Sequence, residues 1–120
     1  MNFKDLGISE PLVQVLKKSG ITTPTSIQEE CIPLIKDYKD VIAQAQTGTG
    51  KTLAFLLPLF ENISPDVCAT QALIITPTRE LALQITEEAN QLAKGKAINV
   101  LAAYGGRNIG SQLNKLKGTI

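Results

Sequence analysis

The sequence contains no histidine and only two cysteines, Cys31 and Cys68, in 120 residues. The cysteines do not form a C-x-x-C pair and no histidine is present to complete a Cys/His cluster, which excludes a zinc-finger type of metal site. We expect two reduced, buried thiols in an intracellular protein. No stretch approaches the roughly 18 apolar residues of a membrane helix, and charged residues interrupt the first ten. We therefore expect a soluble, cytoplasmic protein without a secretion signal or a membrane partner.

The net charge is also close to zero, because 12 Lys and Arg residues and 11 Asp and Glu residues leave a net charge of +1. The charge of the whole chain thus does not argue for a polyanionic partner. Residues 91–120 carry basic side chains and no acidic one, a local bias that is equally typical of a solvated surface. Apolar residues make up 43% of the chain, which is long enough to build one hydrophobic core.

Two helices are predicted in the amino-terminal part of the chain. The first begins at the start signal Ser9-Glu10-Pro11 and ends near Gly20, with apolar residues on one face. The second begins at Thr25, because Pro24 disfavours a helical conformation for Thr23 and Thr25 can cap a helix.

From Asp40 onward, short apolar runs alternate with amphipathic helices. Strands are predicted at 41–43, 72–76 and 99–103, and helices at 53–60, at 78–94 and around Ile109, Leu113 and Leu116. This alternation predicts an α/β fold with a parallel sheet that is covered by helices on both faces. Thr119 and Ile120 resemble the start of a further strand, so we expect the fold to be incomplete at the carboxyl terminus.

Residues 45–52 read AQTGTGKT, which fits a phosphate-binding loop (P-loop) with Ala in place of the usual first Gly. Gly48 and Gly50 let the backbone curl so that N–H groups point at phosphate oxygens, and the following helix adds its positive end. Lys51 supplies an ammonium group for the β- and γ-phosphates, and the Thr52 hydroxyl is placed to coordinate the Mg²⁺ that accompanies ATP. The alternative is an ordinary Gly-rich turn with a surface lysine.

The segments around this loop follow an order that resembles the DEAD-box family of ATP-dependent RNA helicases. Residues 20–28 (GITTPTSIQ) resemble the Q motif, 45–52 motif I and 77–81 (PTREL) motif Ia, and Gly105-Gly106 matches the glycine doublet that follows. The resemblance implies that residues 1–120 are the amino-terminal part of the first RecA-like domain, a P-loop NTPase fold that binds ATP and Mg²⁺.

The resemblance also implies roles for individual residues of the nucleotide site. Gln28 would bind the adenine edge and distinguish ATP from GTP, although Thr25-x-x-Gln28 is also a capping box. Phe3 lies where the family carries an aromatic residue that stacks on the base, although it fits a core position equally well. Lys51 and Thr52 are the expected catalytic residues. The residues expected to bind ATP or ADP are Phe3, Thr23, Gln28, Gln46, Thr47, Gly48, Thr49, Gly50, Lys51 and Thr52.

The family uses motif Ia and the glycine doublet to bind the RNA backbone. A phosphate can lie at the amino terminus of the helix that motif Ia opens. In the alternative, Thr76 or Thr78 only caps this helix, Arg79 pairs with an acidic neighbour, and the glycine pair is only a turn. The residues expected to contact RNA are Pro77, Thr78, Arg79, Gly105, Gly106 and Arg107.

The chain departs from the family because the carboxylates that help to hold magnesium and activate water are missing in their family context. The D-E-A-D and S-A-T motifs and the second RecA-like domain would lie beyond Ile120. We expect the intact protein to couple ATP hydrolysis to unwinding of RNA duplexes. This chain would at most bind nucleotide, as a truncated fragment whose unpaired sheet edges favour self-association. The rival interpretations are another P-loop enzyme, which would lack the Q motif and PTREL, and a non-catalytic nucleotide- or RNA-binding module.

Overall fold

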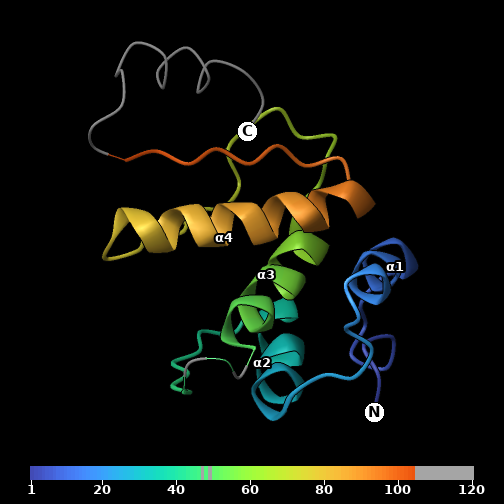
Figure 1. The fold of residues 1–120 in the computed structure, drawn as a ribbon. Helices are drawn as coiled ribbons and strands as arrows, with labels where there is room; N and C mark the ends of the chain where they lie inside the picture. Colours follow the sequence, from blue (N-terminus) through green and yellow to red (C-terminus); the bar gives the residue numbers. More distant parts are fainter. Residues whose placement is uncertain (47, 49, 105–120) are drawn as a thin grey trace.

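The computed structural model describes residues 1–46, 48 and 50–104, and this part of the chain contains four α-helices (Figure 1). They are α1 (Glu10–Lys18), α2 (Ser26–Lys36), α3 (Lys51–Asn62) and α4 (Arg79–Leu92), and a 3₁₀ turn, η1 (Ala93–Gly95), follows α4. Within the described residues, none of the helices has the length and apolar character needed to cross a membrane.

The two amino-terminal helices are confirmed. Ser9 is the N-cap of α1, and a proline lies in its first turn, where the missing N–H has no helical partner to lose. The buried face of α1 carries Leu12 and Leu16, which are 0% and 3% exposed. Thr25 is the N-cap of α2, as predicted. The chain leaves α2 through Tyr38, whose φ of 59° lies in the left-handed region that a bulky residue rarely adopts.

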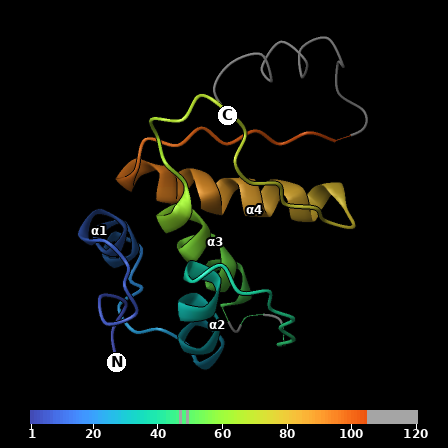
Figure 2. The same ribbon diagram turned by 180° about the vertical axis from the view of Figure 1, so that it is seen from behind.

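Helix α3 lies at the centre of the hydrophobic core. Figures 1 and 2 show it between α2 and α4, and it packs against both. Complete burial of a leucine such as Leu56 or Leu57, both 0% exposed, contributes about 1.5–3 kcal/mol to stability. The core consists of Phe3, Leu6, Ile8, Leu12, Leu16, Ile32, Leu56, Leu57, Phe60, Ile85, Ala89 and Leu92.

Polar contacts from three other segments hold the carboxyl end of α3. Lys96 directly follows η1, and its ammonium group donates to the carbonyl oxygen of Glu61 at 3.2 Å. The side-chain amide of Asn62 donates to the last two carbonyl groups of α2 at 3.2 and 3.3 Å. The carboxylate of Glu61 accepts a hydrogen bond from the backbone N–H of Ser9 at 2.8 Å. The far end of α3 is therefore tied to α1, α2 and η1.

The helices predicted at 53–60 and 78–94 are confirmed as α3 and as α4 with η1, but the three predicted strands are wrong as regular strands. In the described part of the chain, no backbone ladder joins the extended segments. Segments 70–76 and 97–104 instead line a 610 Å³ cavity together with α3 and α4. A ladder requires a partner strand at about 4.8 Å, which an apolar sequence pattern cannot supply by itself. Ile42 and Leu73 consequently remain 103% and 82% exposed.

The prediction of two buried thiols is correct for Cys31 and wrong for Cys68. Both cysteines are free, and Cys68 is exposed because it lies in the irregular segment after α3, outside the core. Burial raises the pKa of the Cys31 thiol, and the neighbouring Glu30 carboxylate raises it further. The helix predicted around residues 109–116 and the strand predicted at 119–120 lie outside the described residues.

Candidate functional site

The amino-terminal end of α3 presents backbone N–H groups and a lysine side chain. Gly50 is the N-cap, with a left-handed φ of 85°, and Lys51 and Thr52 follow as the first helical residues. In the described part of the chain no side chain caps α3, and its first turn contains no acidic residue. Lys51 is exposed and has no ion-pair or hydrogen-bond partner among the described residues. The N–H groups of the first helical turn, the helix dipole and the ammonium group all favour a phosphate at this position.

Gln28 joins α2 to this loop. Its side chain is only 2% exposed. The Oε1 atom accepts a hydrogen bond from the backbone N–H of Thr25 at 2.9 Å, within a capping box, and Nε2 donates to the carbonyl oxygen of Gly50 at 3.1 Å. The capping alternative is therefore present in the structure. Adenine recognition by Gln28 stays a prediction, and it requires these amide atoms to become uncovered.

Two separate constraints select glycine at position 50. The left-handed backbone favours glycine, because a side chain there meets the following carbonyl group. A Cβ atom at Gly50 would also lie 2.4 Å from Nε2 of Gln28 and 3.1 Å from Oγ1 of Thr25. Gly48 has the same φ of 85°, but a Cβ atom there would meet nothing within 4 Å. Contact with α2 thus distinguishes the second glycine of the loop from the first.

Gln28 and Lys51 both lie at the amino-terminal end of α3, since Gln28 is bonded to Gly50, the residue before Lys51. Not every residue predicted for the nucleotide site lies there. Phe3 is 2% exposed and lies in the core, as the alternative interpretation of this residue expected. Stacking of Phe3 on the base stays a prediction, and it requires the ring to become uncovered. Thr23 and Gln46 are exposed, whereas Thr47 and Thr49 lie outside the described residues.

A complete metal site is not formed by the described part of the chain. No group of three Asp, Glu, Cys or His side chains is placed there to hold a metal ion. The Thr52 hydroxyl, half-buried in the first turn of α3, is the predicted magnesium contact. A hydroxyl and a phosphate-binding helix end fit a Mg²⁺ that arrives with ATP, because Mg²⁺ is commonly bound through substrate phosphates and one or two protein oxygens.

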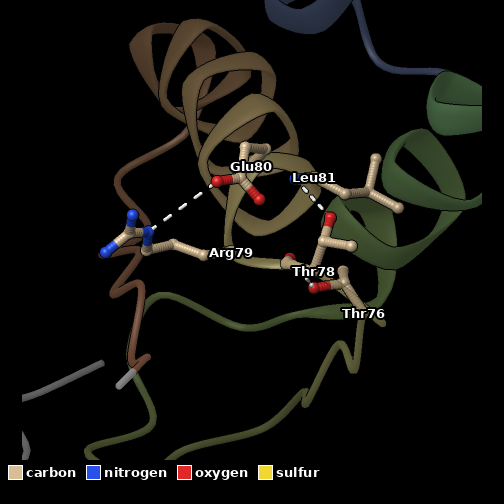
Figure 3. A network of polar contacts seen from close by, with 5 residues as sticks. All are labelled: Thr76, Thr78, Arg79, Glu80 and Leu81. Atoms are coloured by element: carbon tan, nitrogen blue, oxygen red, sulfur yellow. Dashed lines mark hydrogen bonds and ion pairs between the residues drawn. The ribbon is translucent and has the colours of Figure 1, made fainter. Parts of the chain in front are cut away.

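The predicted RNA-binding segment lies at the amino-terminal end of α4 (Figure 3). Thr78 is the N-cap, and its Oγ1 accepts a hydrogen bond from the backbone N–H of Leu81 at 3.1 Å. Oγ1 of Thr76 donates to the carbonyl oxygen of Thr78 at 2.9 Å. Nε of Arg79 lies 4.0 Å from Oε1 of Glu80. The capping and ion-pair alternatives are thus both present.

The RNA contacts themselves stay predictions. Pro77, Thr78 and Arg79 are all exposed on the surface of the described chain, as a backbone-binding segment requires. The other three residues predicted to contact RNA, Gly105, Gly106 and Arg107, lie outside the described residues.

Sequence reasoning missed two contacts between distant segments. One is the hydrogen bond from Gln28 to Gly50, and the other joins the guanidinium carbon of Arg79 to the ring of Tyr104, with 5.9 Å to the ring centroid. A signal for the second contact was available. Tyr104 ends an apolar run, and the carboxyl ends of parallel strands meet at one edge of a sheet.

A helix that begins with Gly-Lys-Thr after left-handed glycines, and that no side chain caps among the described residues, defines the chain as a P-loop nucleotide-binding protein. The family model described as DEAD/DEAH box helicase matches residues 25–120. The chain belongs to the DEAD/DEAH box helicase family.

Two curated relatives illustrate this similarity. The chain is 50% identical over 117 residues to the ATP-dependent RNA helicase CshA of Limosilactobacillus reuteri, a match that covers 98% of this chain and 24% of the relative. It is 44% identical over 116 residues to the ATP-dependent RNA helicase DeaD of Escherichia coli strain K12, covering 96% and 18%. The chain therefore spans about a quarter or less of the length of these relatives.

Solved structures share the path of the chain. A DEAD box protein from the hyperthermophile Methanococcus jannaschii matches with a TM-score of 0.92 and 37% identity, over 99% of this chain and 32% of that one. The RNA helicase Prp28 from Chaetomium thermophilum, bound to ADP, matches with a TM-score of 0.86 and 37% identity, over 98% and 30%. The α/β, RecA-like fold class is thus confirmed, although the described segments form no strand ladder.

Proposed function

We propose that this chain is the ATP-binding part of an ATP-dependent RNA helicase, and that the intact protein uses ATP and Mg²⁺ to unwind or remodel RNA duplexes. Two observations on the described residues carry the proposal: no side chain caps the amino-terminal end of α3, and the ammonium group of Lys51 there has no partner. The names of the relatives, which are ATP-dependent RNA helicases, support it.

The residues of this chain bind and orient the nucleotide. The N–H groups at the start of α3 and Lys51 bind the phosphates. Gln28, whose amide donates to Gly50 in this structure, binds the adenine edge once that amide is uncovered. Mg²⁺, when bound with ATP, neutralises phosphate charge, and the Thr52 hydroxyl would be one of its ligands. ATP hydrolysis also needs carboxylates. We therefore assign binding to this chain and hydrolysis to the intact protein.

We assign the RNA backbone to the exposed surface of residues 77–79 and, from the sequence alone, to residues 105–107, which lie outside the described residues. Exposed polar groups at a helix amino terminus can bind phosphates of any sequence, so this surface would position RNA without reading its bases. We also propose a cytoplasmic location, which the two free thiols support. We further propose that the isolated chain self-associates through the extended apolar segments that expose Ile42 and Leu73.

Titration with fluorescent ADP tests the nucleotide site. The 120-residue chain and the native-length protein would be competed with unlabelled adenine and guanine nucleotides. We expect adenine-selective binding that Lys51→Ala abolishes and that Gln28→Ala makes unselective. Lys17→Ala, which removes an exposed lysine from the last turn of α1, is the matched control and should bind normally.

The outcomes separate the candidate functions. ATP hydrolysis by the native-length protein, but not by the 120-residue chain, would support the helicase proposal. Selective binding without hydrolysis at either length would favour a non-catalytic nucleotide- or RNA-binding module. Folded proteins that show no selective binding at either length would refute both.

A further inference from the structure

Tyr104 and Arg79 come from different segments and meet at the amino-terminal end of α4. The guanidinium carbon of Arg79 lies 5.9 Å from the centroid of the Tyr104 ring, within the range of about 6 Å over which cation–π attraction operates. Tyr104 is half-buried at the end of segment 97–104, which runs alongside α4 (Figure 1). The ring therefore contacts Arg79 from outside its own helix.

The known contacts of Arg79 leave its terminal nitrogens available. Nε faces the carboxylate of Glu80 at 4.0 Å (Figure 3). The two Nη groups have no hydrogen bond to any described residue. The side chain is still 55% exposed. The Nη groups carry four N–H donors in a planar fork, a geometry that suits the oxygens of a phosphate.

Of the two contacts, the ring is better suited to orient the guanidinium. The Glu80 carboxylate is 75% exposed and its ion pair is long, so solvent and salt screen it. An arginine side chain without a fixed partner samples many rotamers, and it must lose this freedom when it binds a phosphate. A ring held by a neighbouring segment restricts these rotamers before RNA arrives.

We propose that Tyr104 is a positioning residue that holds the guanidinium of Arg79 ready for an RNA phosphate. This inference rests on the proposed function, which places the RNA backbone at the amino-terminal end of α4. It adds a residue that acts through Arg79 and does not itself touch the RNA. It also links the two predicted RNA-binding segments, because Tyr104 directly precedes Gly105.

The test measures binding of a fluorescein-labelled oligouridine to the native-length protein by anisotropy, over a range of KCl concentrations. Tyr104→Phe keeps the ring, whereas Tyr104→Leu keeps apolar bulk in the half-buried position without it. We expect Tyr104→Leu to weaken binding about two- to fivefold and Tyr104→Phe to bind nearly as wild type. Arg79→Ala should weaken binding and lower the slope of log K against log salt by about 0.7. Tyr104→Leu should have no further effect in the Arg79→Ala background.

The failures of the two hypotheses are distinguishable. If Arg79→Ala changes neither affinity nor salt slope, the assignment of RNA phosphates to this end of α4 fails, and the role of Tyr104 fails with it. If Arg79→Ala weakens binding as expected but Tyr104→Leu does not, only the positioning role is refuted. Equal weakening by Tyr104→Leu with and without Arg79 would indicate that the ring stacks on a base, which also refutes the positioning role. Unchanged binding of fluorescent ADP to each variant controls for folding.

Discussion

Replacement of Gln28 by glutamate should make the stability of this protein depend on pH in a way that the wild type does not. The side chain is 2% exposed, and its two polar ends have different partners. Oε1 accepts from the N–H of Thr25, and Nε2 donates to the carbonyl oxygen of Gly50 at 3.1 Å. In Gln28→Glu a carboxylate oxygen would replace Nε2 and face a second acceptor, whereas a protonated carboxyl group could still donate.

The magnitude follows from burial and hydrogen bonding. An unsatisfied buried polar group costs about 1–3 kcal/mol, and a buried unpaired charge costs several kcal/mol. The positive amino-terminal end of α2 favours the charged form by only about 0.3–1 kcal/mol, so burial should prevail and raise the pKa of the introduced carboxyl group. A group whose pKa is raised by folding stabilises the native state below its unfolded pKa of about 4.3. That stability is lost as the pH rises through the folded pKa, by up to about 1.4 kcal/mol per pH unit.

Urea unfolding followed by circular dichroism between pH 4 and pH 8 would measure this dependence. We expect Gln28→Glu to approach the wild type at the acidic end and to become steadily less stable toward pH 8. Gln28→Ala is the control, because it removes both hydrogen bonds and should lose about 1–3 kcal/mol at every pH. A Gln28→Glu variant that tracks Gln28→Ala at all pH values would refute the reasoning, since the carboxyl group would then gain nothing from protonation.

Three further changes should alter stability. Tyr38→Gly should raise the free energy of unfolding by about 1 kcal/mol in thermal unfolding, because φ is 59° and the exposed ring loses little packing. Gly50→Ala should destabilise more than Gly48→Ala in urea unfolding, because φ is 85° at both but only the first introduces a Cβ atom close to Gln28. Partial desolvation, followed by the charge of Glu87, raises the pKa of Glu88, although this residue is exposed. Glu88→Gln should therefore be more stable than wild type at pH 7, and the difference should vanish below pH 4.

Each of these three predictions has a contrary outcome. A Tyr38→Ala variant keeps a Cβ atom in the left-handed conformation and should not gain the stability of Tyr38→Gly, so equal gains would show that backbone strain is not the cause. Equal losses in Gly48→Ala and Gly50→Ala would show that the contact with α2 contributes nothing. A gain in Glu88→Gln that persists at low pH would exclude a charge effect.

Local signals predicted the helices well, and long-range contacts limited the rest. The first two helices could be located because Ser9 and Thr25 are cap residues whose effect depends on their immediate neighbours. The strands were predicted from apolar runs, but a ladder depends on a second segment at the correct distance. The exposed side chain of Leu73 shows an apolar run that has no such partner among the described residues.

The candidate site was predicted in part for the same reason. The loop at 45–52 has a strong local pattern, and the placement of Lys51 at the start of a helix followed from it. The pattern Thr25-x-x-Gln28 could not distinguish a cap from a nucleotide contact, because both use the same amide. The link from Gln28 to Gly50 spans 22 positions and depends on how α2 packs against α3.

The polar contacts at the carboxyl end of α3 have a consequence for the loop at its other end. A helix bends little along its length. The hydrogen bonds of Lys96, Asn62 and the carboxylate of Glu61 hold α3 at its carboxyl end, which is the end remote from the phosphate loop. The end that carries the loop is held as well, by the hydrogen bond from Gln28 to Gly50, so α3 is fixed at both ends. We expect a substitution at Lys96 to loosen the carboxyl end of α3 and, through the helix, to shift the loop at its other end. We therefore expect variation at this lysine to alter the affinity of the proposed nucleotide site, although Lys96 is not among the residues predicted to meet the nucleotide.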